Sequence, residues 1–232
     1  MERKNRGLSG NQLKLIALVC MTLDHMGLLL FGQYRLLRIV GRLAFPVFAW
    51  MIAEGCRHTR SMGKYLGAMA TVAALCQIVY FVAQRSLDMC IMVTFSLSVG
   101  LCWLIRLTRE KKSVLFGILA ALGVIALFFV TDILPQLLRD RASFSVDYGF
   151  LGVMLPVVLY LCNSKGRQLL AAAGMLGLMA LWSGWDIQIY GLLALPLLAL
   201  YNGKRGKWKL KWLFYIYYPA HLVAIYFLTY VF

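Results

Sequence analysis

Two adjacent ionisable residues, Asp24 and His25, lie inside the first long apolar run of the sequence, where a charged side chain is costly. A neutral imidazole takes up a proton well near pH 7, and a carboxylate can fix its tautomer and stabilise the imidazolium. The pair is therefore a candidate for general-base chemistry. Neighbouring residues of a helix point about 100° apart, so adjacency alone does not establish a contact between the two side chains.

Two further ionisable side chains lie deep within apolar runs, Arg42 in the second run and His221 in the last. A guanidinium stays charged when buried, so Arg42 can bind a developing oxyanion or the carbonyl of a ligand. Counted from the midpoints of the expected spans, these residues and the Asp24-His25 pair fall in one layer near the middle of the membrane. The structural alternative is that Asp24 pairs with Arg42 to fasten two helices, and that His221 bonds a backbone carbonyl.

A polar, basic cluster ends the second apolar run. Glu54 and His58 have i, i+4 spacing, which places them on one helical face, and Arg57, Arg60 and Lys64 accompany them. Such a cluster is typical of ordinary interfacial anchoring. The functional alternative is a docking surface for a phosphorylated cytosolic ligand.

Two connecting segments are further candidates for binding. In Asn202-Gly203-Lys204-Arg205-Gly206, two glycines free backbone N–H groups beside two cations, which suits phosphate, although basic loops of membrane proteins often share this pattern. Asp147 and Tyr148 open the sixth expected span at its outer edge. A helix N-cap accounts for Asp147, and recognition of an acceptor molecule is the alternative.

The composition explains where these residues must be positioned. Of 232 residues, 62% are hydrophobic and only 14% are charged, so water cannot be the main solvent of the chain. The first apolar run is too long for a secretory signal, which indicates a retained first helix. The net charge of +15 lies in short loops without a nucleic-acid-binding motif, and the six cysteines are scattered, which favours neither a nucleic-acid partner nor a metal site.

The apolar runs predict an all-α, polytopic membrane helical bundle that forms one domain over residues 1–232, with the lipid bilayer as its partner. Nine transmembrane spans are expected at 12–32, 36–56, 65–84, 88–107, 113–134, 146–162, 168–184, 186–201 and 211–231. With the N-terminus in the cytoplasm, most of the 24 basic residues fall in cytoplasmic connections. We therefore expect a multi-pass protein of the cell inner (plasma) membrane.

Several segments of the chain, in order, resemble one known family. They are Met21-Thr22-Leu23-Asp24-His25-Met26-Gly27, Gly41-Arg42-Leu43-Ala44-Phe45-Pro46-Val47-Phe48, Ala53-Glu54-Gly55, His58-Thr59-Arg60, Asp147-Tyr148-Gly149, Leu200-Tyr201-Asn202-Gly203-Lys204-Arg205-Gly206 and Phe214-Tyr215-Ile216-Tyr217-Tyr218-Pro219-Ala220-His221-Leu222. By these motifs the chain resembles the TraX family, which takes its name from an acetylase of the F-type pilin N-terminus and is related to the wider group of membrane acyltransferases.

The resemblance implies an acetyl- or acyltransferase that uses cytosolic acetyl-CoA or another acyl-CoA and no metal. The acceptor would be an amine or hydroxyl of a peptide or pilin N-terminus, a glycan or a small molecule. His25 would be the base and Asp24 would orient it. Arg42 would stabilise the thioester oxyanion or position the donor, and His221 would be a second candidate for acid/base work. The CoA phosphates would be held by the basic loops, namely Arg57, His58, Arg60, Lys64, Asn202, Lys204 and Arg205; the acceptor would be bound by Glu54, Asp147 and Tyr148.

Two other classes of function are compatible with the same residues. A proton-coupled transporter would use the buried Asp, His and Arg layer as a path for protons, and inverted repeats would favour it, but no convincing internal repeat is present. A non-catalytic membrane scaffold would leave the polar layer unexplained.

Overall fold

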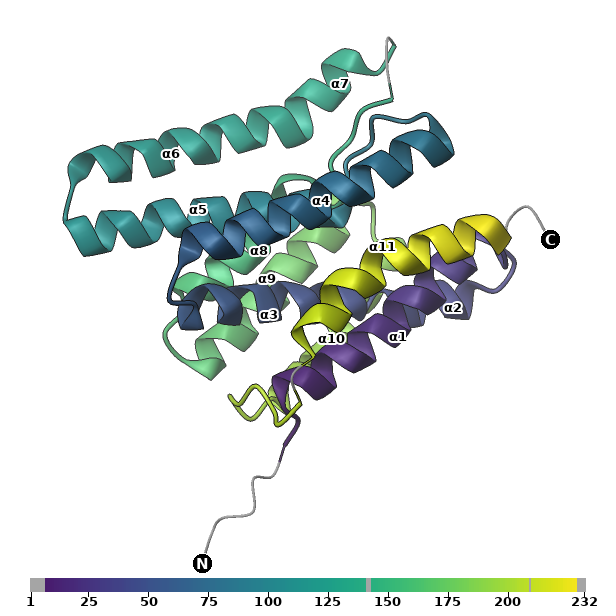
Figure 1. Ribbon diagram of the computed structural model, residues 1–232, viewed down its shortest axis with the longest axis horizontal. Coiled ribbons are helices and arrows are strands. Elements are labelled where there is room, and N and C mark those ends of the chain that lie inside the picture. The colour runs from purple at the N-terminus through teal and green to yellow at the C-terminus, as the bar shows by residue number, and fades with distance from the viewer. Residues whose placement is uncertain (1–6, 141–142, 209, 229–232) are drawn as a thin grey trace, which may run out of the picture. The chain divides into compact units, whose positions relative to one another are not determined.

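Helices form all the regular secondary structure in the described part of the chain, which covers residues 7–140, 143–208 and 210–228 of a computed structural model (Figure 1). The α-helices are α1 (Gly10–Leu29), α2 (Arg35–Gly41), α3 (Ala44–His58), α4 (Met62–Gln84), α5 (Ile91–Lys111), α6 (Val114–Phe128), α7 (Leu134–Leu138), α8 (Gly149–Leu161), α9 (Lys165–Trp182), α10 (Ala194–Ala199) and α11 (Lys211–Leu228). A π-helical turn, η1 (Phe129–Ile133), joins α6 to α7, and a 3₁₀-helix, η2 (Ile187–Leu193), precedes α10. The predicted all-α fold class is confirmed.

Within the described residues these elements make nine helical segments, which fall where the nine spans are predicted. The second span is interrupted, because α2 ends at Gly41 and α3 begins at Ala44. Pro46 has no N–H to donate to the carbonyl of Arg42, so the helical hydrogen-bond ladder cannot continue unbroken through this point. Residues 229–231 of the ninth predicted span lie outside the described residues.

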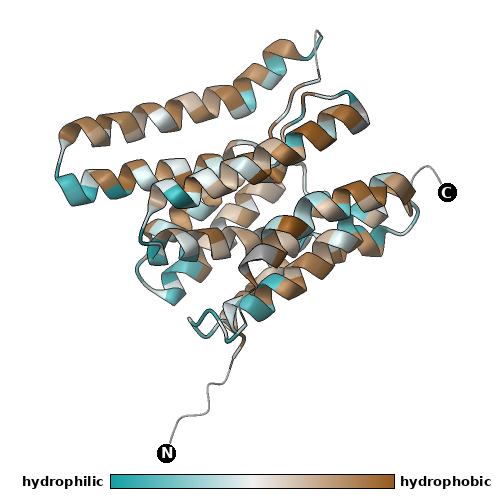
Figure 2. Ribbon diagram, viewed as in Figure 1, coloured by the Kyte–Doolittle hydropathy of each residue, from teal (hydrophilic) through white to brown (hydrophobic). Residues whose placement is uncertain are grey.

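Five helical stretches are long and apolar enough to cross a membrane: Gly10–Leu29, Arg35–His58, Met62–Val82, Ile91–Lys111 and Val114–Leu138. Three shorter apolar helices are Gly149–Leu161, Ile187–Ala199 and Leu213–Leu228. Helix α6 leaves large aliphatic side chains such as Leu115, Ile118 and Ile125 exposed, and Figure 2 shows it as almost uniformly hydrophobic. Side chains of this kind need lipid around them, so the chain is an integral membrane protein.

The chain forms two compact units. Unit 1 comprises Met1–Met51 and Cys162–Phe232, and unit 2 comprises Ile52–Leu161, so that α3 contributes to both. In unit 1, α1 packs against α2 and α11, and η2 packs against α2 and α9. In unit 2, α5 packs against α4, α6 and α8. A single domain over residues 1–232 would require these two units to pack together as one body, and it stays a prediction.

Helices α1 and α2 of unit 1 approach closely because glycines lie at their contact. A Cβ added to Gly41 would lie 2.3 Å from the Cβ of Asp24, and one added to Gly27 would lie 2.8 Å from the Cβ of Leu37. Neither position therefore accepts a side chain without a shift of the backbone. The missing side chains let two membrane helices pack at short distance, as small residues do in membrane proteins. This packing brings the carboxylate of Asp24 against the arginines of α2.

Candidate functional site

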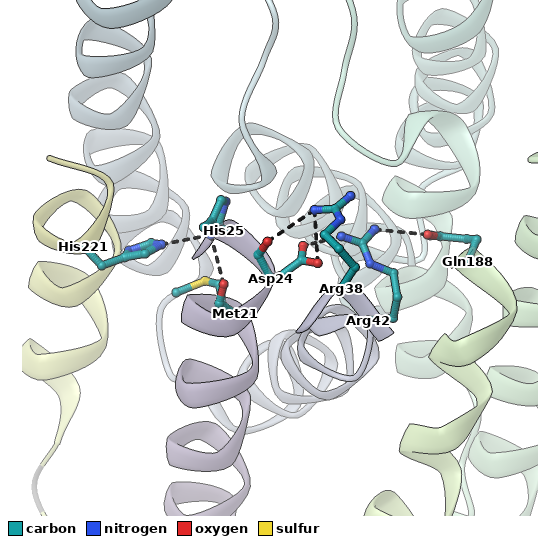
Figure 3. Close-up of polar contacts among 7 residues, drawn as sticks. All are labelled: Met21, Asp24, His25, Arg38, Arg42, Gln188 and His221. Atoms are coloured by element: carbon teal, nitrogen blue, oxygen red, sulfur yellow. Dashed lines mark hydrogen bonds and ion pairs between the residues drawn. The ribbon is translucent and has the colours of Figure 1, made fainter. Parts of the chain in front are cut away.

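The predicted pairing of Asp24 with Arg42 is present in unit 1, and a second arginine joins it. Arg42 Nη2 donates to Asp24 Oδ2, and Arg38 Nη1 lies 3.1 Å from Asp24 Oδ1. The side chains are largely buried, with exposed fractions of 14% for Asp24, 11% for Arg42 and 21% for Arg38. One carboxylate thus faces two guanidinium groups, and Figure 3 shows both arginines turned toward it, Arg38 from α2 and Arg42 from the C-cap of α2.

Residues of η2 and its leading turn extend this polar cluster on the far side of α2. Arg42 Nη1 donates to Gln188 Oε1 at 3.2 Å, and Arg35 Nη2 lies 3.0 Å from Asp186 Oδ1. The Arg35–Asp186 pair is mostly exposed, unlike the other two arginine contacts. The arginine side chains of α2 are therefore held between α1 on one side and the start of η2 on the other.

The two histidines of the predicted layer also meet in unit 1. His221 Nε2 lies 3.2 Å from His25 Nδ1, and the ring centroids are 5.0 Å apart. His221 is buried and His25 is partly buried. Figure 3 shows His25 turned toward His221 while Asp24, on the same helix, turns toward the arginines. The expectation that Asp24 orients His25 finds no support among the described contacts; His221 and the carbonyl of Met21 are the partners of His25.

The backbone around the two imidazoles assigns their tautomers. His25 Nδ1 lies 3.1 Å from the carbonyl oxygen of Met21, and His221 Nδ1 lies 3.1 Å from that of Tyr217. A carbonyl oxygen can only accept, so both Nδ1 atoms carry the proton. His221 Nε2 then presents a lone pair to the N–H of His25. His25 Nε2 keeps its lone pair and is therefore the basic atom of the pair. Among the described residues, no hydrogen-bond donor or acceptor is found beside it.

Tyr217 and Thr22 hold the two histidine helices together. The hydroxyl of Thr22 donates to the carbonyl of Leu18 at 3.0 Å, which leaves the Tyr217 hydroxyl as donor in the 2.7 Å contact with Thr22 Oγ1. The ring of Tyr217 stacks on that of His221, with centroids 5.4 Å apart and planes 12° apart. The position of His221 against α1 is therefore set by a tyrosine one helical turn before it.

The predicted basic cluster at the end of α3 lies in unit 2 and is partly structural. The i, i+4 pair is confirmed, since His58 Nε2 lies 3.5 Å from Glu54 Oε2. Arg57 contacts Glu54 Oε1 at 2.7 Å and donates to the carbonyl of Leu159 at the end of α8. That contact ties Arg57 to the packing of two helices. The side chains of the other cations are exposed, namely His58, Arg60 and Lys64.

The predicted phosphate loop lies in unit 1 and caps helix α1. The N–H groups of Gly10 and Asn11 donate to the carbonyls of Lys204 and Arg205 at 2.8 and 2.9 Å. The side-chain oxygen of Asn202 accepts from the N–H of Lys204 at 2.9 Å. The N–H of Lys204 is thus engaged within the loop, and the loop carbonyls satisfy the first N–H groups of α1. The cationic side chains of Lys204 and Arg205 remain exposed, and the phosphate-binding role of the loop stays a prediction.

Asp147 and Tyr148 stand just before α8 in unit 2. Tyr148 has φ 62° and Gly149 has φ 56°, two successive left-handed residues of which only the glycine is suited to that conformation. Helix α8 begins at Gly149, and the N–H of Phe150 donates to Asp132 Oδ2 at 2.8 Å. Asp132, on the π-helical turn η1, thus supplies a cap to α8 that sequence analysis does not identify.

Three further residues of the site were not predicted from the sequence as site residues, namely Arg38, Gln188 and Tyr217. Two of them carry a signal that spacing could reveal, because Arg38 precedes Arg42 by four residues and Tyr217 precedes His221 by four. Residues so spaced share one helical face. Gln188 is an amide within an apolar run, which is weaker information. Its contact with Arg42 depends on the packing of η2 against α2, which no local pattern specifies.

The fold and this site define a helical integral membrane protein with a buried, charged side-chain cluster. The chain matches the TraX protein family over residues 9–229 and belongs to that family. It is similar to the probable fimbrial assembly protein FimC, serogroup H1, of Dichelobacter nodosus, with 30% identity over 249 residues and 96% of each chain covered. It also shares 47% identity over 38 residues, 16% of this chain and 15% of the other, with the uncharacterized protein RP591 of Rickettsia prowazekii (strain Madrid E). No solved structure matches the chain.

Proposed function

We propose that this TraX-family protein is a membrane-embedded acetyl- or acyltransferase that moves an acyl group from cytosolic acyl-CoA to an amine or hydroxyl acceptor. The observation that carries the proposal is the His25–His221 pair. In the neutral imidazoles, its hydrogen bonds place the proton on Nδ1 and leave the Nε2 lone pair of His25 as a base. A base of this kind is what an acceptor amine or hydroxyl needs in order to attack a thioester.

The chemical step follows from these contacts. His25 Nε2 takes the proton from the acceptor as the acceptor nitrogen or oxygen bonds to the thioester carbonyl carbon. The imidazolium so formed is stabilised because its Nδ1–H already donates to His221 Nε2. An N–H of Arg42 stabilises the oxyanion of the tetrahedral intermediate. The intermediate collapses with cleavage of the C–S bond, and the departing CoA thiolate takes the proton back from His25.

The geometry alters the roles expected from the resemblance. His221 acts as a positioning residue for His25, since its own Nε2 faces the N–H of its partner. Asp24 positions Arg42 and does not touch His25 in the described contacts. The exposed cations form two separate candidate sites for the CoA phosphates, Lys204 and Arg205 in unit 1 and His58, Arg60 and Lys64 in unit 2.

The name of the D. nodosus relative places that protein in fimbrial assembly. We extend this to the acceptor and propose that it is an amine or hydroxyl of a fimbrial subunit or of a molecule that modifies one. Such an acceptor would meet the enzyme at the inner membrane, with acyl-CoA supplied from the cytoplasm. Under this proposal the N-terminus is cytoplasmic, as the distribution of basic residues predicts.

The test is acyl transfer by the purified full-length protein in detergent with radiolabelled acetyl-CoA. Release of CoA and transfer of label to an amine acceptor are measured for wild type, His25→Ala and His58→Ala. His25→Ala should lower kcat by about 10²- to 10⁴-fold, the usual contribution of a general base. His58→Ala removes an exposed imidazole assigned to CoA binding, so it should raise KM with little change in kcat.

A folding control accompanies these variants. Thr71→Val changes an exposed side chain of α4 and should leave both constants unchanged. If His25→Ala retains activity within a few-fold of wild type, the base is elsewhere and the mechanism is wrong. If the wild type neither binds nor turns over acetyl-CoA, but reconstituted vesicles show a substrate-dependent proton flux lost in Asp24→Asn, the protein is a transporter.

A further inference from the structure

Helix α2 and its C-cap residue carry a row of three arginines. Arg35, Arg38 and Arg42 have i, i+3, i+7 spacing, which places them on one helical face. We call them the arginine row. Each contacts a polar side chain of a neighbouring element: Arg35 meets Asp186, Arg38 meets Asp24, and Arg42 meets Asp24 and Gln188. The guanidinium groups of the row therefore contact both α1 and the start of η2.

The row holds more positive than negative charge. Its three guanidinium groups face two carboxylates, those of Asp24 and Asp186, and Gln188 contributes no charge. In a membrane protein an unbalanced charge is costly unless a counterion or a ligand offsets it. Within these contacts the row therefore carries one more positive charge than the carboxylates that it faces, and such an excess attracts anions.

Arg38 is the member with donors to spare. Its Nη1 serves both contacts that it makes, at 3.1 Å to Asp24 Oδ1 and 3.4 Å to the carbonyl of Asp24. No other acceptor for its guanidinium is found in the described residues, which leaves Nε and Nη2 without a partner there. These two N–H groups form the edge of the guanidinium that binds carboxylate or phosphate in bidentate fashion.

The exposure of the row changes along the helix. The exposed fraction of the side chain falls from 66% at Arg35 to 21% at Arg38 and 11% at Arg42. Arg42 is also the member that the mechanism places at the thioester oxyanion. An anion that arrives at the exposed end would thus meet successive cations on its way toward the buried end, and a graded row of one sign steers and concentrates anions.

We propose that the arginine row binds an oxyanion group, carboxylate or phosphate, that the acyl acceptor carries near its nucleophilic amine or hydroxyl. The inference rests on the proposed function and names the chemical class of its acceptor. Arg38 grips the oxyanion through Nε and Nη2, and Arg35 attracts it at the exposed end. The acceptor's nucleophile is thereby left free to reach His25, which follows Asp24 on α1.

Matched acceptor pairs test the assignment. β-Alanine is compared with β-alaninamide, and phosphoethanolamine with ethanolamine, for equilibrium binding to the full-length protein in nonionic detergent and for acetyl transfer. The member with the oxyanion should bind about tenfold more tightly, a difference typical of one charge-assisted bidentate contact. If the β-alanine pair shows the larger difference in affinity, the oxyanion is a carboxylate. If the phosphoethanolamine pair shows it, the oxyanion is a phosphate.

Three variants test whether Arg38 causes the tighter binding of the oxyanion member of each pair. Arg38→Gln should abolish it, Arg38→Lys should keep part of it because the charge remains, and Arg139→Gln should leave it intact because that exposed arginine belongs to unit 2. Equal binding of both members of each pair by the wild type overturns the proposal. So does a preference that survives in Arg38→Gln, or an Arg38→Gln defect confined to acetyl-CoA binding.

Failure of the proposed function gives a different result. If the wild type binds the oxyanion members preferentially and transfers no acetyl group to any acceptor, the arginine row stands as an anion site and the transferase is wrong. If acetyl transfer proceeds equally to both members of each pair, the transferase stands and the arginine row is wrong.

Discussion

Both units of this protein bury polar side chains among apolar helices, but they use them differently. In unit 2, Ser98 donates to the carbonyls of Thr94 and Val153, and the carboxylate of Asp132 accepts from the N–H of Phe150 and the hydroxyl of Thr131. Three of these four bonds involve backbone atoms, two of them on a neighbouring helix. They satisfy helix ends and fasten helices, which is a structural use.

In unit 1 the polar side chains contact one another. Asp24 binds two arginines, and His25 meets His221. In the described contacts, Nε and Nη2 of Arg38 have no hydrogen-bond acceptor and Nε2 of His25 has no hydrogen-bond donor. A buried polar residue in a membrane helix is therefore better evidence of function when its bonds end on other side chains and leave some capacity unused than when they end on the backbone.

The largest expected difference between the two units comes from the same substitution of an acid in each. Asp24→Asn removes the negative charge of the carboxylate that Arg38 and Arg42 both contact, so we expect a loss of about 3–5 kcal/mol in the free energy of unfolding. Asp132→Asn keeps a side-chain oxygen that can accept from Phe150 N–H, so we expect about 1 kcal/mol or less. SDS-driven unfolding in mixed micelles measures both.

The acetyl-transfer assay provides the matching control. Asp24→Asn should also lose transfer activity because Arg42 is no longer positioned, whereas Asp132→Asn should retain it. Equal losses of stability in the two variants would mean that the cluster of unit 1 is as structural as the cap of unit 2.

The close packing of α1 on α2 is the next point to test. Gly41→Ala places a Cβ against Asp24, so the helices must separate and the carboxylate must move; we expect a loss of about 1–3 kcal/mol in unfolding free energy together with reduced acetyl transfer. Gly174→Ala on α9 is the control, because no atom lies within 4 Å of the added Cβ. There, alanine should stabilise the helix by up to about 1 kcal/mol. Similar behaviour of the two variants would show that the glycine contact does not determine the site.

The elements of the fold are predictable from sequence because lipid tolerates few backbone conformations. Each apolar run predicts one helix, and the structure has a helical segment at each predicted position in its described residues. The details that differ have local causes, such as the break at Arg42 that Pro46 imposes. The π-helical turn at Phe129–Ile133 has no comparable sequence signal.

The site is predictable in its members and less so in its contacts. A layer that holds Asp24, His25, Arg42 and His221 follows from the depth of each residue in its span, and the Asp24–Arg42 contact follows as one alternative. The contact between His25 and His221 joins residues 196 positions apart and depends on how α11 lies against α1. Side-chain direction around each helix decides it, and depth alone carries no such information.

The smallest expected effect is a pH dependence in unit 2, at Asp88 between α4 and α5. Its carboxylate accepts from the hydroxyls of Ser86 at 2.5 Å, Ser143 at 3.0 Å and Ser145 at 2.8 Å. Partial burial is the largest single influence and raises the pKa of Asp88, but the hydrogen bonds from the three serines together outweigh it and hold the pKa below its ordinary value of 3.8. The charged form is therefore favoured by folding.

A group whose pKa is depressed in the folded state stabilises the protein above its unfolded pKa and loses that contribution as the pH falls through the folded value. The contribution of Asp88 should thus be complete above pH 3.8 and decline below it. We expect less than about 1 kcal/mol, since the carboxylate is partly exposed. Unfolding free energies of wild type and Asp88→Asn, measured from neutral to acidic pH, should differ above pH 3.8 and converge below it. A difference that instead grows on acidification would mean that the serine hydroxyls do not favour the charged carboxylate of Asp88.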